Sequence, residues 1–209
     1  MSTLTVYGIA GDGWVRSNDA TYATARSGSS LIAITADANN LEIGQDGGGG
    51  YYLYESFIGF DTSALGSSAT VSAAVLSLWL LIDNSTVDWT VQARLQSWSA
   101  GGLTTADWVA GASLTQTLLA TLATSGIGAT GAYKDFTSDA AFPGNVNKTG
   151  NTEMILCASD MVTGTPPAEF RDVIFDDTDT AGTTSDPKLT ITYTIPATGY
   201  TNLPLLGVG

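Results

Sequence analysis

The sequence predicts an all-β protein, built as a single jelly-roll-like antiparallel β-sandwich. Two observations support this fold class. Threonine, alanine, serine and glycine dominate the 209 residues and only 13% are charged, so strong helix formers such as Lys, Arg, Glu and Gln are scarce. Short runs of alternating or apolar residues recur between turn clusters, a pattern typical of sandwiches rather than of βαβ units.

The strand pattern runs along the chain without an internal repeat or a long linker. We therefore expect one β-sandwich domain at 1–195. The segment 196–209 holds prolines, glycines and apolar residues that cannot form a core alone, which predicts an extended C-terminal docking tail. Strands are expected at 12–16, 30–34, 51–60, 74–82, 88–97, 133–137, 152–158, 170–175 and 188–195.

The stretch 51–60, YYLYESFIGF, has an aromatic pattern that fits a central strand. Tyr52, Tyr54 and Phe60 fall on one side of an extended chain, and Glu55 and Phe57 fall on the other. We expect this strand to be buried on most of both faces, with its aromatic rings filling the space between two sheets.

Two other expected strands, 74–82 and 188–195, have a clear inward face. The inward positions are expected at Leu76, Leu78, Leu80 and Ile82 in the first strand and at Leu189, Ile191, Tyr193 and Ile195 in the second.

The segment 114–131 is ambiguous. Its leucine spacing fits a helix while its threonine content favours extended chain, and we favour strand or irregular structure.

The charge and composition exclude several classes of function. The net charge is −13 and the seven basic residues are scattered, so we expect no binding to nucleic acid or to anionic membranes. The chain has no histidine, which removes the commonest general base and most zinc and copper sites, and we expect no enzyme activity. No apolar run reaches the length of a membrane span, and no export signal is evident.

Carboxylates and a lone thiol are the remaining chemical candidates. The only glutamates are Glu42, Glu55, Glu153 and Glu169, and nothing in the sequence pairs two of them for glycoside hydrolysis. Cys157 lies in an apolar run and is expected to be a small buried residue. Asp61 ends the aromatic strand, where its carboxylate is expected to accept backbone N–H groups and fix a turn.

Two candidate binding sites remain. No cofactor is expected apart from a structural calcium ion, for which oxygen ligands cluster at Asp176, Asp177 and Asp179; the alternative is a solvated acidic turn. Trp98 and Trp108 flank a glycine-rich turn and are candidate platforms for a glycan, as are Trp14 and Trp89 near strand ends. The alternative for each tryptophan is a place in the core.

The segment 52–80, YLYESFIGFDTSALGSSATVSAAVLSLWL, resembles the core of the DNRLRE-type β-sandwich domains, which are grouped with carbohydrate-binding modules. The paired tryptophans in 94–108 and the closing strand in 186–194 extend the resemblance over about residues 12–194. A glutamate or serine, Glu55 or Ser56, replaces the basic residue of the family's aromatic strand. The motif positions are Phe60, Asp61, Ser63, Leu65, Ala69 and Val71.

The resemblance, an unprocessed start at Met1 and the apolar tail are similar to what is found in sandwiches of tailed-phage particles. They imply a non-enzymatic virion structural protein, made in the host cytoplasm and acting as a capsid decoration, head fibre or tail appendage. Its partners would be copies of itself and other virion proteins. The alternative is a carbohydrate-binding or adhesive module that recognises a surface glycan, and an acid-catalysed glycosidase is a third. Assembly contacts are expected at Pro196, Tyr200, Leu203, Pro204, Leu205 and Leu206.

Overall fold

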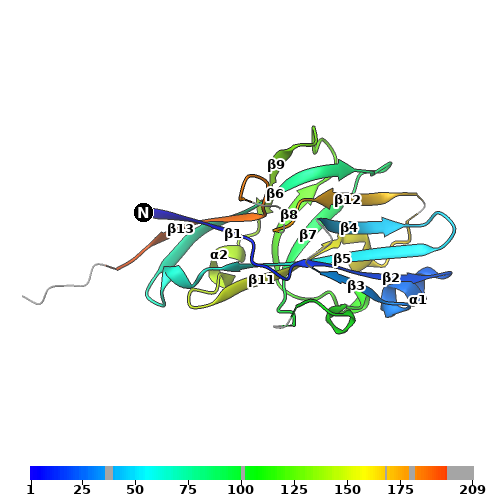
Figure 1. Cartoon of the computed structure of the whole chain (residues 1–209), viewed down its shortest axis with the longest axis horizontal. Helices are drawn as coiled ribbons and strands as arrows, with labels where there is room; N and C mark the ends of the chain where they lie inside the picture. Colours follow the sequence, from blue (N-terminus) through cyan, green and yellow to red (C-terminus); the bar gives the residue numbers. More distant parts are fainter. Residues whose placement is uncertain (36–39, 100–101, 168, 179–181, 197–209) are drawn as a thin grey trace, which may run out of the picture.

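The computed structural model describes residues 1–35, 40–99, 102–167, 169–178 and 182–196 (Figure 1). Its helices are short: α1 (Tyr22–Gly28), α2 (Phe142–Asn145) and α3 (Ser159–Thr163), with 3-10 turns at Ser63–Leu65, Thr105–Asp107 and Gly111–Ser113. The strands are β1 (Ser2–Tyr7), β2 (Gly13–Asp19), β3 (Ile32–Thr35), β4 (Leu41–Asp46), β5 (Tyr51–Asp61), β6 (Thr70–Asp83), β7 (Thr90–Leu95), β8 (Leu118–Ala123), β9 (Ala132–Asp135), β10 (Thr137–Ser138), β11 (Asn151–Ala158), β12 (Arg171–Phe175) and β13 (Lys188–Thr194).

The described strands form one large curled sheet, and each strand pair in it is antiparallel. Along the sheet the order is β1-β13-β6-β12-β4-β5-β11-β7-β8-β10, while β2 joins β3 to β5 and β9 pairs with β6. In Figure 1, β12, β4, β5 and β2 lie side by side at the right, and β1 and β13 extend together to the left. The predicted all-β class is confirmed, and the division into a jelly-roll sandwich stays a prediction.

Two long strands, β5 and β6, hold this sheet together. β5 pairs with β2 from Tyr51 to Phe57 and with β11 from Ser56 to Asp61. β6 pairs with β13 in its first part and with β12 near its end. Both strands were expected from their apolar patterns, because residues buried on both faces are apolar at nearly every position.

The core agrees with the expected inward faces except near two strand ends. Leu76, Leu78, Leu80, Leu189 and Ile191 are fully buried. The predictions for Ile82 and Ile195 are wrong, since these side chains are 44% and 58% exposed. A register shift between β12 and β6 places Ile174 opposite Ile82 but Phe175 opposite Leu80, so an extra residue of β6 turns Ile82 to the outside. Ile195 follows the end of β13, where nothing described covers it.

The sequence did not predict the strands β1 and β4 or the helices α1, α2 and α3. The strand β4, LEIGQD, contains Gly44 with φ of +142°, where a Cβ atom would lie 2.0 Å from the carbonyl oxygen of Arg171. The close approach of β12 requires glycine there, although glycine argues against a strand in the sequence. The ambiguous segment 114–131 contains β8, as expected.

Other expectations concern single segments. Cys157 is fully buried, as predicted. Among the described residues, no helix is long and apolar enough to span a membrane. Of the predicted tail, Pro196 is exposed. Residues 197–209 lie outside the described residues, and with them the predicted assembly contacts at Tyr200, Leu203, Pro204, Leu205 and Leu206.

Candidate functional site

The strands β12, β4, β5 and β2 have two different faces, because successive side chains of a strand point to opposite sides. One face is part of the core. Its fully buried apolar side chains are Val15, Leu41, Ile43, Leu53, Phe57, Val173 and Phe175. The other face, here called the open face, consists of the alternate residues of the same strands and is mostly half-buried. Its members are Trp14, Arg16, Asn18, Glu42, Asp46, Tyr52, Tyr54 and Asp172.

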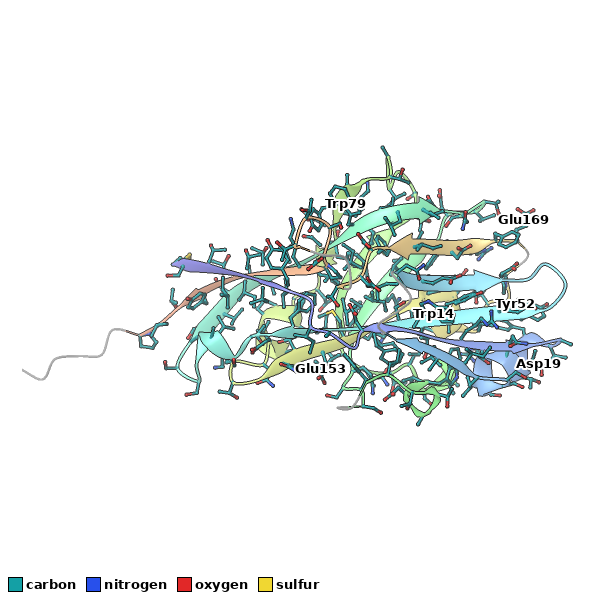
Figure 2. The ribbon with its side chains drawn as sticks, in the orientation of Figure 1. Trp14, Asp19, Tyr52, Trp79, Glu153 and Glu169 are labelled. Atoms are coloured by element: carbon teal, nitrogen blue, oxygen red, sulfur yellow. The ribbon has the colours of Figure 1, made fainter. Side chains whose placement is uncertain are left out.

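Three aromatic side chains lie on the open face. In the register of the sheet, Tyr54 is opposite Arg16 and Tyr52 is opposite Asn18. Trp14 lies two residues before Arg16 on β2, and its side chain is on the same face. The rings of Trp14 and Tyr54 meet edge to face, with centroids 5.5 Å apart. The Trp14 indole Nε1 donates a hydrogen bond to the Asn40 side-chain oxygen at 3.2 Å. Figure 2 shows Trp14 near the middle of the sheet and Tyr52 toward one end.

One cation is placed among these rings. The Arg16 guanidinium carbon lies 5.3 Å from the centroid of the Tyr52 ring, within the range of a cation–π contact. Burial raises the pKa of Tyr54 and of Glu42, and the same guanidinium is close enough to oppose both rises. Arg16 on β2 therefore lies among side chains of β5 and β4.

Two carboxyl groups on the open face have raised pKa values. Burial first, and then the charge of Asp172, raise the pKa of Glu42 to about 7, against the opposing effects of Arg16 and a hydrogen bond with Tyr54. Burial also raises the pKa of Asp172, although the Asn84 amide donates a hydrogen bond to it at 2.9 Å. Asp172 lies opposite Gly44 and Glu42 lies opposite Ile174, so the two carboxyl groups are diagonal neighbours.

The open face corrects one expectation about the stretch 51–60. Phe57 and Phe60 are fully buried, but Tyr52 and Tyr54 are half-exposed. Their hydroxyl groups explain the difference, because a hydroxyl needs a polar partner, and the hydroxyl of Tyr54 has Glu42 beside it on this face. The aromatic strand is therefore partly a surface element.

The predicted glycan platforms, Trp98 and Trp108, lie at the two ends of a closed loop. Asp107 closes it by accepting hydrogen bonds from the Ser99 and Thr104 backbone N–H groups at 2.9 and 2.8 Å. Both rings are half-buried and pack against the core, with Trp108 against Gly28, where a Cβ atom would lie 2.7 Å from the ring. This packing favours a structural role, and glycan binding by this pair stays a prediction.

Two further predicted positions are clearly placed. Trp89 is only 6% exposed and belongs to the core. Asp61 accepts a hydrogen bond from the Ser63 backbone N–H at 3.0 Å, which confirms the predicted turn, and hydrogen bonds with Ser63 lower its pKa.

The predicted calcium ligands are partly outside the described residues. Asp176 and Asp177 are buried, and Asp179 is not described. Within the described ranges, no three carboxylate or thiol groups come together in a way that would hold a metal ion. The calcium site therefore stays a prediction.

Comparison with known proteins does not place the chain in a family. No protein-family model matches it, and no curated protein matches it significantly. The resemblance to the DNRLRE-type domains stays a prediction, and the function must be inferred from the open face.

Sequence reasoning named Trp14 and the two tyrosines singly but missed their grouping with Arg16, Glu42 and Asp172. These residues come from segments around 14, 42, 53 and 172 that only the strand order brings together. The one local signal was the alternation in WVRSN and YYLYES, where every second residue is polar or aromatic.

Proposed function

We propose that this chain is a non-enzymatic carbohydrate-binding or adhesive module whose open face binds a glycan. The observation that carries this proposal is the group of three half-buried aromatic side chains, Trp14, Tyr52 and Tyr54, among amide, guanidinium and carboxyl groups on one sheet face. Sugar rings have apolar C–H faces and polar hydroxyl edges, so they bind to aromatic rings that are bordered by hydrogen-bonding groups.

The rings are held in position before a ligand arrives. Trp14 is fixed by its hydrogen bond to Asn40 and by the Tyr54 ring, and Tyr52 is fixed by the Arg16 guanidinium. A surface that is already ordered loses little conformational entropy on binding. This supports a role in recognition.

The charges of the open face favour a neutral ligand. Glu42, Asp46 and Asp172 outnumber Arg16, and the whole chain carries a net charge of −13. Phosphate or uronate groups would meet like charge on this face. Neutral glycans supply hydroxyl groups that donate hydrogen bonds to carboxylates, and they carry no charge that these carboxylates would repel.

The proposal is tested by binding to a printed glycan array and by calorimetry with each glycan that responds. Tyr54→Ala and Trp14→Ala should each weaken binding by about tenfold or more, because burying the apolar face of a sugar against an aromatic ring contributes on the order of 1–2 kcal/mol. The matched control is Tyr133→Ala. Tyr133 forms an equivalent edge-to-face pair with Trp79, at 5.2 Å, on a different part of the sheet. Equal losses in all three variants would contradict the proposal.

Hydrolysis is the competing activity, because Glu42 and Asp172 are neighbouring carboxyl groups with raised pKa values. The bound glycans are incubated with the protein and assayed for new reducing ends. We expect none. Release of reducing ends that Glu42→Gln abolishes would show that the protein is a glycosidase.

The virion structural protein remains a second candidate, and one observation favours its self-assembly. β1 lies at the end of the strand order, pairs with β13 and has the uncharged sequence STLTVY without proline. An edge strand without charge or proline is open to pairing with another chain. Light scattering tests this: Thr5→Pro should convert a defined oligomer to monomer, and a wild-type monomer at high concentration would exclude it. Deletion of 196–209 tests the tail separately.

A further inference from the structure

An exposed aromatic side chain, Phe170, lies next to the open face. Its side chain is 51% exposed, and it directly precedes β12. The chain here is already extended and paired. The Asn84 backbone N–H donates a hydrogen bond to the Asp172 carbonyl oxygen at 3.0 Å, and the Thr86 N–H donates one to the Phe170 carbonyl oxygen at 3.1 Å. Phe170 and Asp172 are two residues apart in this extended chain, so both side chains point to the side that carries the open face.

Phe170 belongs to a row of side chains that runs across the strands. The register of β12 and β4, continued by one residue, places Phe170 beside Asp46. Asp46 is opposite Tyr52 on β5, and Tyr52 is opposite Asn18 on β2. In this cross-strand row an aromatic ring alternates with a polar group, in the order Phe170, Asp46, Tyr52 and Asn18. Figure 2 shows Tyr52 and Glu169, the residue before Phe170, toward the same end of the strands.

The sheet sets the spacing of the two rings in the cross-strand row. Neighbouring strands lie about 4.7–4.9 Å apart, so the backbones at Phe170 and Tyr52, with β4 between them, are about 9–10 Å apart. In an extended chain of hexoses joined through equatorial bonds, as in cellulose and linear mannan, each sugar is turned over relative to the one before. Every second sugar then presents the same apolar face, and two rings at this spacing match that repeat. Asp46 between them accepts hydrogen bonds from hydroxyl groups of the intervening sugar.

Among the described residues, neither end of the cross-strand row is closed. A hollow of about 350 Å³, open to solvent, lies beside Asn18 and Tyr52 at one end. At the other end Thr86, which pairs with Phe170, is exposed. A chain longer than the row can therefore continue past both ends, so the row is suited to the interior of a polysaccharide.

We infer that the ligand of the open face is an extended chain of neutral, equatorially linked hexoses, which lies across β12, β4 and β5 and stacks on Phe170 and Tyr52. Tyr54 lies two residues along β5 and borders the same path, and the Trp14 ring packs against it. The inference rests on the proposed function of the open face and adds Phe170 to it.

The test compares extended and curved chains of equal length. The probes are cellohexaose and mannohexaose, which are equatorially linked, and maltohexaose, whose axial bonds make it curved; binding is measured by calorimetry. Phe170→Ala and Tyr52→Ala should each weaken binding of an equatorially linked hexasaccharide by about tenfold or more. Phe170→Tyr keeps an aromatic ring and should retain the parent affinity.

The matched control is Tyr7→Ala, because Tyr7 is an aromatic residue of β1, outside the open face, and is 38% exposed. It should leave binding unchanged. Thermal unfolding of Phe170→Ala should match that of the parent, since about half of this side chain is in solvent.

The outcomes separate the cross-strand row from the open face as a whole. The inference is supported if Phe170→Ala and Tyr52→Ala weaken binding, Tyr7→Ala does not, and maltohexaose binds more weakly than the extended chains. It is overturned if a glycan binds through Trp14 and Tyr54 while Phe170→Ala leaves its affinity unchanged, or if maltohexaose binds as tightly as the extended chains; the proposed function then survives. If no glycan binds here or on the array, both are wrong.

Discussion

The inner and open faces of β4, β5 and β2 each hold a glutamate, and the two are held differently. On the inner face Glu55 is fully buried, and its Oε2 accepts a hydrogen bond from the Val109 backbone N–H at 2.9 Å. Its Oε1 makes no hydrogen bond within the described residues, and burial raises its pKa well above the usual value. On the open face Glu42 interacts with Tyr54, Arg16 and Asp172.

This difference shows how one strand set serves two purposes. Glu55 is fully buried and burial is the main cause of its raised pKa, so its ionisation mainly affects stability. Glu42 belongs to a group of charges and hydroxyls at the surface, so its ionisation changes the face that a ligand meets. The inner face supplies the rigid support, and the open face supplies the chemistry.

The largest effect is expected at Gly44, which both faces need. A Cβ atom at this position would lie 2.0 Å from the Arg171 carbonyl oxygen, so Gly44→Ala should separate β4 from β12 and lower the free energy of unfolding by more than about 4 kcal/mol. Urea unfolding measures this. Gly49→Ala is the control, because its φ is also positive, +110°, but its Cβ would meet nothing within 4 Å. Gly49→Ala should lower the free energy of unfolding by about 1–2 kcal/mol. An equal loss of stability in the two variants would show that the contact with Arg171 is not the cause of the effect at Gly44.

The next effect separates the two faces of β5. Phe57 is fully buried, so Phe57→Ala should lower the free energy of unfolding by about 3–5 kcal/mol. Tyr54 is half-buried, and Tyr54→Ala should lower the free energy of unfolding by about 1 kcal/mol while weakening glycan binding. Urea unfolding and calorimetry are run on both variants. A larger stability loss for Tyr54→Ala would show that the open face also carries the fold.

The third effect is the pH dependence that Glu55 gives to stability. Its folded pKa lies above the unfolded value of 4.5, so the folded state binds more protons and stability falls as pH rises above about 4.5. Glu55→Gln keeps the shape without the charge. It should therefore be more stable than the parent at pH 7, and the difference should vanish below about pH 4. Thermal unfolding across this range measures it, and a variant less stable at pH 7 contradicts the assignment.

The smallest effect concerns Glu42. Its pKa of about 7 is also above 4.5, so it weakens folding as pH rises from about 4.5 to about 7, but solvent screens a half-exposed group and the change should be smaller than at Glu55. The sharper measurement is the NMR titration of the Glu42 carboxyl carbon. Asp172→Asn removes a repelling charge and should lower the midpoint. An unchanged midpoint would mean that burial alone raises the pKa.

The sequence predicted the strands in which the pattern of apolar residues matches the pattern of buried side chains. β5, β6 and β11 are apolar over most of their length, β13 alternates apolar residues with threonines, and the Asp61 turn depends on a side chain and a backbone group two residues apart. β4 was missed because its glycine is required by the backbone of β12, far away in the chain. The outward turn of Ile82 was missed because a register shift between β6 and β12 has no signal within β6 alone.

The sequence by itself determined the all-β class, the two long central strands and the acidic, histidine-free composition, because these follow from local propensity and from counting residues. Only the tertiary structure decided which side chains meet. Trp14, Glu42, Tyr54 and Asp172 share a face because hydrogen bonding places β2, β4, β5 and β12 next to one another, and that order depends on contacts between distant segments. The hollow beside Asn18 and Tyr52 likewise exists only because the end of β2 lies next to the start of β5.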